Sequence, residues 1–156
     1  MRTDVPEFCF GQLFSGCGDY LVDASALELP ATELGTACYL AMFSNCSALE
    51  SAPELPATEL APHCYEGMFA GCSSLTVAPE LPAQSFPTSR PASGGGDVNP
   101  VSEGAYCYYY MFAGCTSLTS LTAWFREWGG NNTDGWLTDV ASNGTFFCSL
   151  DLASST

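Results

Sequence analysis

Apolar and polar positions alternate along residues 74–81, Ser-Leu-Thr-Val-Ala-Pro-Glu-Leu, directly before Pro82. Alternation with a period of two is the pattern of a strand that buries one of its faces. The stretch therefore predicts a short strand whose inward side chains are Leu75, Val77 and Leu81.

A spacing of four residues comes before this strand. Leu60, Cys64 and Met68 are each four apart within residues 57–69, which predicts one apolar stripe of a short helix or of helical turns. Gly71 follows, a residue type that tolerates the left-handed backbone at helix ends. One strand and one short helix cannot close a core alone, so we expect this unit to stack on copies of itself.

The chain contains such copies. The stretch that begins at Cys38 shares Cys-Tyr, Met-Phe, Cys, Leu and Ala-Pro-Glu-Leu-Pro-Ala with the stretch that begins at Cys64, 26 residues later. The same frame opens at Cys9 and Cys107. Three extra residues separate the first two copies, and 17 extra residues, rich in Pro, Gly and Ser, separate the last two. We interpret the longer surplus, within 84–106, as an inserted loop.

The predicted fold is therefore an α/β solenoid of four stacked coils, which begin at about residues 9, 38, 64 and 107. We assign residues 1–156 to this single repeat domain and residues 126–156 to a non-repeating C-terminal cap. Leu49, Leu75 and Leu118 hold one repeat position, and we expect them to align in one interior column.

The repeat unit resembles the BspA-like leucine-rich repeats of bacterial cell-surface proteins. The residues that carry the resemblance are Met-Phe-Ala-Gly-Cys-Ser-Ser-Leu-Thr at 68–76, Met-Phe-Ala-Gly-Cys-Thr-Ser-Leu-Thr at 111–119 and Met-Phe-Ser-Asn-Cys-Ser-Ala-Leu at 42–49. The resemblance covers roughly residues 8–125. It implies a leucine-rich-repeat solenoid displayed for adhesion to a host or bacterial surface protein or glycan, and it carries no catalytic residue with it.

The charge of the chain excludes several partners. The 156 residues carry 17 acidic side chains against three arginines and no lysine, a net charge of −14. Such a chain cannot neutralise a phosphate backbone or lean on anionic lipid, so we expect no nucleic acid partner. No apolar run approaches the ~20 residues of a membrane helix, so we expect no membrane insertion. We place the protein outside the cell or at its surface, with its signal or anchor outside this chain.

Nine cysteines in such a chain allow two interpretations. Eight of them could form disulfides in 105 pairings. The alternative, which we favour, is a ladder of buried reduced thiols, because the paired cysteines are eight residues apart and eight helical residues rise ~12 Å, too far for one bridge. Zinc sites favour cysteines two to four residues apart, a spacing that this sequence lacks. We therefore expect no metal and no cofactor.

The sequence offers little catalytic chemistry, and we expect no enzyme. His63 is the only histidine, and its neighbour Cys64 is expected to be buried, which excludes an activated thiolate. Glu28, Glu54 and Glu80 share one repeat position and should stack at about 4.8 Å. We interpret them as a solvated, screened edge, and a Ca²⁺ site bridging two coils is the alternative.

Aromatic residues mark the candidate contact site. Tyr109 and Tyr110 stand at variable repeat positions, next to Tyr106 at the exit of the inserted loop, and Arg90 is the only basic residue of that loop. Long loops on rigid scaffolds often carry binding residues, so we predict a binding site there; the alternative is that the loop folds back and buries the tyrosines. The predicted function is a surface-displayed recognition or adhesion module, and the alternative is a structural spacer or stalk without its own ligand.

Overall fold

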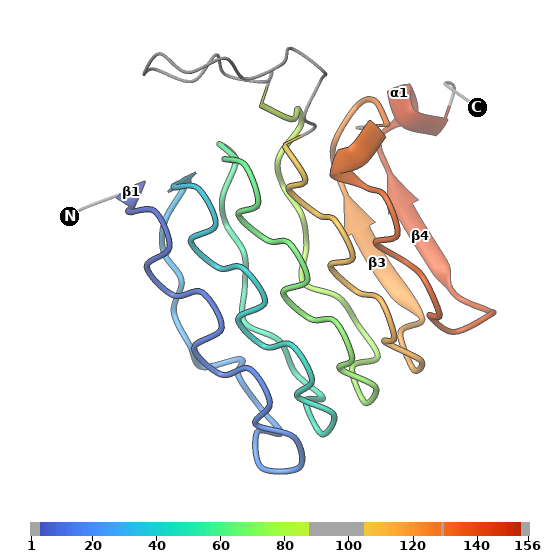
Figure 1. Cartoon of the computed structure of the whole chain (residues 1–156). Helices are drawn as coiled ribbons and strands as arrows, with labels where there is room; N and C mark the ends of the chain where they lie inside the picture. Colours follow the sequence, from blue (N-terminus) through green and yellow to red (C-terminus); the bar gives the residue numbers. More distant parts are fainter. Residues whose placement is uncertain (1–3, 88–104, 129, 154–156) are drawn as a thin grey trace.

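The computed structural model describes residues 4–87, 105–128 and 130–153. Five winding segments lie side by side from the N-terminus to the C-terminus, and each is followed by a straighter segment on the opposite side (Figure 1). We call the winding segments turn rows and number them from the N-terminus; they span residues 8–17, 37–46, 63–72, 106–115 and 130–140.

Regular secondary structure is sparse. Two parallel two-stranded sheets are present in the described chain, one from β1 and β2 and one from β3 and β4. The elements in chain order are β1 (Asp4–Val5), β2 (Glu33–Leu34), β3 (Ser120–Ala123), the 3₁₀ helix η1 (Gly130–Asn132), β4 (Thr145–Cys148) and α1 (Leu150–Ala153). No helix in the described residues has the length and apolarity that a membrane crossing requires.

The predicted leucine-rich-repeat solenoid, with one strand and one helix in each α/β coil, is therefore wrong. No α-helix lies in any turn row; the single α-helix of the described chain is α1, near the C-terminus. Instead of a full ladder of strands, the straighter segments are joined by isolated bridges, such as Asp23 to Ser51 and Val77 to Ser120. The fold is mostly irregular backbone.

The turn rows explain why a helix was expected. In the second row, every other N–H group donates to the carbonyl three residues earlier, as Cys38 does to Gly35. The remaining N–H groups donate to carbonyls of the next row, as Tyr39 does to Cys64 at 3.1 Å. Every fourth residue, here Ala37 and then Ala41, has a left-handed backbone. A chain of tight turns thus repeats every four residues, close to the 3.6 of a helix.

The predicted cap at residues 126–156 contains a fifth turn row, so its backbone is not wholly non-repeating. The Tyr108 N–H donates to the Asn132 carbonyl at 2.9 Å, and Phe112 donates to Trp136 at the same distance. The residues from 130 to 140 therefore continue the pattern of the four preceding rows, and Trp136 is 6% exposed. What differs is the sequence, because this row lacks the cysteines and the Met-Phe pair of the others.

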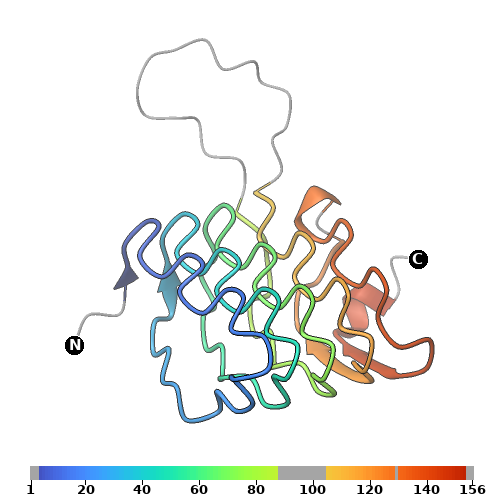
Figure 2. The same cartoon turned by 60° about the horizontal axis from the view of Figure 1, so that its bottom comes forward.

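Side chains of equivalent residues stack from row to row and form one core. Phe14, Phe43, Phe69 and Phe112 form one column, with successive ring centroids 5.3, 5.5 and 5.7 Å apart. A second column consists of Phe10, Tyr39, Tyr65 and Tyr108. Figure 2 shows the turn rows that align these rings, side by side along the molecule. All of these rings except the exposed Phe10 belong to or pack against one continuous core, which also contains buried thiols and leucines.

The cysteines add hydrogen bonds to this core. The thiols of Cys46, Cys72 and Cys115 donate to phenylalanine carbonyls of the preceding row, at 3.1, 3.2 and 3.1 Å. A buried thiol here has both an apolar contact and an acceptor. Leu49, Leu75 and Leu118, the expected interior column, are at most 5% exposed and belong to the same cluster.

The straighter segments differ from the predicted strand. Leu75 and Leu81 are fully buried, but Val77 is 58% exposed, so the alternation fails at its centre. The partner of Val77 is Ser120, 43 residues later, and the partner of Leu81 is Ala123, 42 residues later. One extra residue bulges out between these bridges, which a constant repeat offset cannot anticipate.

Candidate functional site

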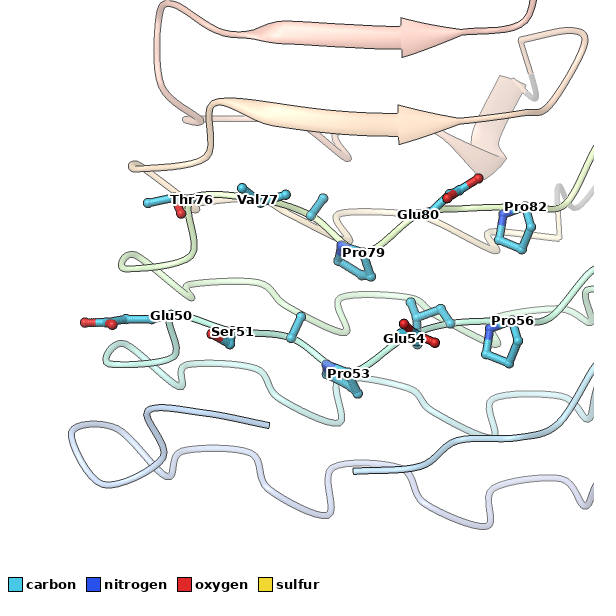
Figure 3. A pocket seen from close by; sticks show the side chains of 13 residues that line it. Glu50, Ser51, Pro53, Glu54, Pro56, Thr76, Val77, Pro79, Glu80 and Pro82 are labelled. Carbon is cyan, nitrogen blue, oxygen red and sulfur yellow. The ribbon is translucent and has the colours of Figure 1, made fainter. Parts of the chain in front are cut away.

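A groove opens on the side of the straighter segments. It has a volume of about 720 Å³ and lies between residues 50–56 and residues 76–82. Figure 3 shows the two segments on either side of it, with side chains from both. We call it the proline groove because proline recurs at equivalent positions of both walls, as Pro53, Pro56, Pro79 and Pro82.

The prolines explain why the walls stay apart. Where the next segment follows, the Trp124 N–H donates to the Leu81 carbonyl at 3.0 Å. Pro82 stands at the position equivalent to Trp124 and has no N–H, so the carbonyl of Leu55 receives no such bond. Within the described chain, no backbone hydrogen bond joins residues 50–56 to residues 76–82. The sequence Glu-Leu-Pro-Ala therefore opens a gap between otherwise connected segments.

The groove is acidic and contains no aromatic ring. Glu50, Glu54 and Glu80 line it and are exposed, and the hydroxyl-bearing Ser51 and Thr76 lie on the same walls. The predicted row of equivalent glutamates thus borders this groove in part. Among the described residues, no group of three or more Asp, Glu, His or Cys could hold a metal ion.

Trp124 orients one of these carboxylates. Its indole N–H donates to the Glu80 carboxylate, and the indole itself is 42% exposed. By counting repeat offsets, Trp124 would fall at the position of Leu55 and Leu81 in the core, and the bulged residue of the preceding segment shifts it to the surface instead. Glu80 therefore lines the groove, while Trp124 holds its carboxylate on the side of the neighbouring segment (Figure 3).

The three predicted tyrosines form a separate group, the tyrosine cluster. The Tyr106 ring is edge-to-face with Tyr109 at 5.2 Å, and Tyr109 is edge-to-face with Tyr110 at 4.5 Å. Tyr106 also stacks on His63 at 5.3 Å and accepts a hydrogen bond from the Asn131 amide at 3.2 Å. The structure therefore brings all three tyrosines together.

The cluster lies at the surface, in contact with the last turn row. Tyr106 and Tyr109 are half-buried, and Tyr110 is 42% exposed. Gly135 leaves room for the Tyr110 ring, because a Cβ there would lie 2.8 Å from it. Loss of solvent raises the pKa of the Tyr109 phenol, with smaller effects from Tyr110 and Asp134.

Arg90, the fourth predicted site residue, lies outside the described residues, as do residues 88–104 of the inserted loop. The prediction that this loop contributes to binding therefore stays a prediction.

His63 has a partner that the sequence did not reveal. Its Nδ1 lies within hydrogen-bond distance of the Glu66 carboxylate, three residues later. The adjacent Cys64 is fully buried, and burial, followed by the neighbouring Cys107, raises the pKa of its thiol well above the usual value. His63 and Cys64 therefore do not form an activated nucleophile pair.

The cysteines are free and mostly buried. All nine are unbridged. Six of the eight repeat cysteines are buried. The other two belong to the first turn row, where Cys9 is exposed and Cys17 is half-buried. The expectation of buried thiols is confirmed for those six.

Sequence reasoning missed the proline groove. The signal was present in the repeated Ala-Pro-Glu-Leu-Pro-Ala, whose two consecutive copies carry proline at the same positions and so remove the same donors from adjacent segments. A scan against protein-family models, a search of curated proteins and a search of solved structures each find no match. The resemblance to BspA-like repeats thus stays a prediction.

Proposed function

We propose that this chain is a non-catalytic recognition module that binds an extended, positively charged segment of a protein partner in the proline groove. The observation that carries the proposal is the opening of the backbone ladder between residues 50–56 and 76–82 into a groove of about 720 Å³. Ligand sites commonly have volumes of about 300–1,000 Å³.

The unpaired backbone of the groove suits an extended chain. The N–H of Ala78 bonds to the Ser120 carbonyl, but its equivalent Ala52 has no partner across the groove among the described residues. The carbonyls of Val77 and Leu55 likewise face no donor there. A peptide strand brings N–H and C=O groups at the spacing of such a wall.

The charge of the groove favours a cationic segment. Glu50, Glu54 and Glu80 border it, and the whole chain carries a net charge of −14. Lysine and arginine can lay their aliphatic stems on apolar proline rings while the charged group reaches a carboxylate. Such complementary charge also speeds association.

The lining of the groove favours a protein over a glycan. Sugars are commonly held on aromatic faces, and the residues that line this groove include none. Of the two partners suggested by the sequence, a surface protein therefore fits this groove better. Display at the cell surface stays a prediction.

Binding can be tested with an acetylated, amidated peptide of about nine alternating arginine and alanine residues, long enough to span the groove when extended. Its counterpart with glutamate in place of arginine is the control peptide. Calorimetry should give a Kd for the first that rises steeply with salt, and no binding of the second.

Matched variants locate the site. The double variant Glu54→Gln and Glu80→Gln should weaken binding by about three- to tenfold, roughly what two partly exposed carboxylates contribute. Glu33→Gln with Glu127→Gln removes the same charge outside the groove lining and should have a smaller effect. Equal losses in both double variants would show non-specific attraction and refute the groove site. No binding of either peptide would favour the spacer alternative.

A further inference from the structure

The first turn row presents an open edge, independent of the proline groove. In each later row, alternate carbonyls accept a hydrogen bond from the row before, as Leu40 does from Gln12 at 2.8 Å. The equivalent carbonyls of the first row belong to residues 7, 9, 11, 13 and 15, and no donor reaches them from any described residue. We call this the N-terminal edge.

Apolar side chains accompany these carbonyls. Leu13 is 57% exposed, although Met42 and Met68 at the equivalent positions are buried. Phe8 is 68% exposed, and a hollow of about 320 Å³ is lined by Phe10 and Leu13. The edge therefore has the side chains of an interior row, and no row among the described residues covers it.

The last turn row presents the complementary groups at the other end. The N–H groups of Gly135, Leu137 and Asp139 occupy positions whose equivalents donate to a following row, as Tyr110 does to Asp134 at 3.1 Å. Among the described residues, none of these three groups donates a hydrogen bond. We call this the C-terminal edge. Beside it, Leu137 and Phe146 line a hollow of about 170 Å³.

We propose that the N-terminal edge binds the C-terminal edge of a second copy of this chain, so that copies associate head to tail. The row register sets the contact. The N–H groups of Gly135, Leu137 and Asp139 would donate to the carbonyls of Gly11, Leu13 and Ser15, as each row does to the next within the chain.

Donor and acceptor chemistry selects this arrangement over a symmetric dimer. Two N-terminal edges would bring carbonyl against carbonyl, and two C-terminal edges would bring N–H against N–H. A head-to-tail contact leaves one edge of each kind open, so the assembly grows without closing. In this register Asp134 aligns with Gly11 and Asp139 with Gly16, so neither carboxylate meets an equivalent acid.

Two blocking variants test the proposal. Leu13→Arg places a charge on the N-terminal edge only, and Leu137→Arg places one on the C-terminal edge only. Thr32→Arg, at an exposed residue between the first two turn rows, is the charge-matched control. Masses are measured by sedimentation over an about 100-fold concentration range under reducing conditions, in about 0.5 M NaCl to screen the acidic chains.

The expected results distinguish head-to-tail growth from all other states. With rising concentration, the mass of the wild type and of Thr32→Arg should exceed that of two chains of 16.5 kDa each. Each blocked variant should keep the mass of a single chain. An equimolar mixture of the blocked variants should reach two chains and stop, because each supplies the edge that the other lacks. The proposal is overturned by a monomeric wild type, by a blocked variant that associates alone, or by a mixture that stays monomeric or exceeds two chains.

A second measurement needs no variant and remains decisive if Leu137→Arg fails to fold. Cys9 is exposed on the N-terminal edge. Its alkylation in the wild type should slow by about tenfold between the lowest and the highest concentration, because the second copy covers it. An unchanged rate would overturn the proposal.

Discussion

Phe69→Leu tests whether stacked rings hold the rows together. Phe69 is fully buried at the centre of its column, 5.5 Å from the Phe43 ring and 5.7 Å from the Phe112 ring. Phe14→Leu is the matched control, because Phe14 stands at the end of the same column and stacks on one ring only, at 5.3 Å. Both changes remove a ring and keep an apolar side chain.

The expected loss follows from the number of ring contacts. An aromatic pair contributes about 0.5–1.5 kcal/mol beyond its buried area, so Phe69→Leu should lower the free energy of unfolding by about 1–3 kcal/mol from two pairs. The poorer fit of leucine in a packed site adds up to about 1.5 kcal/mol. Phe14→Leu should lose about 0.5–1.5 kcal/mol, since it breaks one pair at the half-buried end.

Urea unfolding at neutral pH measures both values, and thermal melting should follow at about 2–4 °C per kcal/mol for a chain of this size. The double variant Phe43→Leu and Phe69→Leu should then lose less than the two single losses together, by about the value of one pair. Equal losses in Phe14→Leu and Phe69→Leu would refute the reasoning, because stability would then not depend on the number of stacked neighbours.

Three further predictions concern titration, thiols and the tyrosine cluster. Burial raises the pKa of the Cys38 and Cys115 thiols from 9.0 to about 12, so these thiols lose their protons at lower pH in the unfolded chain than in the folded one. The free energy of unfolding should therefore be constant below pH 9 and fall above it, by up to about 1.4 kcal/mol per pH unit for each thiol before solvent screening. Equal urea midpoints at pH 8 and pH 11 would contradict this prediction. A thiol reagent should react quickly with Cys9 alone in the native protein and with all nine cysteines after denaturation without reductant, whereas one reactive thiol after denaturation would mean four disulfides. Replacing the three tyrosines of the tyrosine cluster by alanine should cost about 1–3 kcal/mol, the value of two edge-to-face pairs; a loss above about 6 kcal/mol in urea unfolding would place them in the core.

The sequence predicted which side chains are buried better than it predicted the backbone. Cys38, Cys64 and Leu75 were expected to be interior from their repeat positions, and each is fully buried. The stripe at Leu60, Cys64 and Met68 was expected to be helical. Over two turns a four-residue repeat of tight turns and a helix of 3.6 residues per turn place side chains alike, so apolar spacing cannot separate them.

The candidate sites show the same division. The tyrosines were found from their variable repeat positions, and the structure brings them together. The proline groove was missed because it depends on backbone hydrogen bonds that do not form between residues 50–56 and residues 76–82. Trp124 is exposed because a bulge in the preceding segment breaks the constant repeat offset that would place it in the interior, and Val77 is exposed because the apolar alternation fails there.

The alternating hydrogen bonds of the turn rows fix a four-residue phase, or frame, within each row. Within a row, a residue's place in the four-residue cycle decides whether its N–H serves its own row or the next, and whether its backbone is left-handed. An insertion of one, two or three residues inside a row would put every later residue of that row out of phase. The surplus residues fit this restriction: the three extra ones follow Cys17, the 17 others fall within 84–106, and both sets lie between rows. Length variation in this chain is therefore confined to places where the frame starts anew.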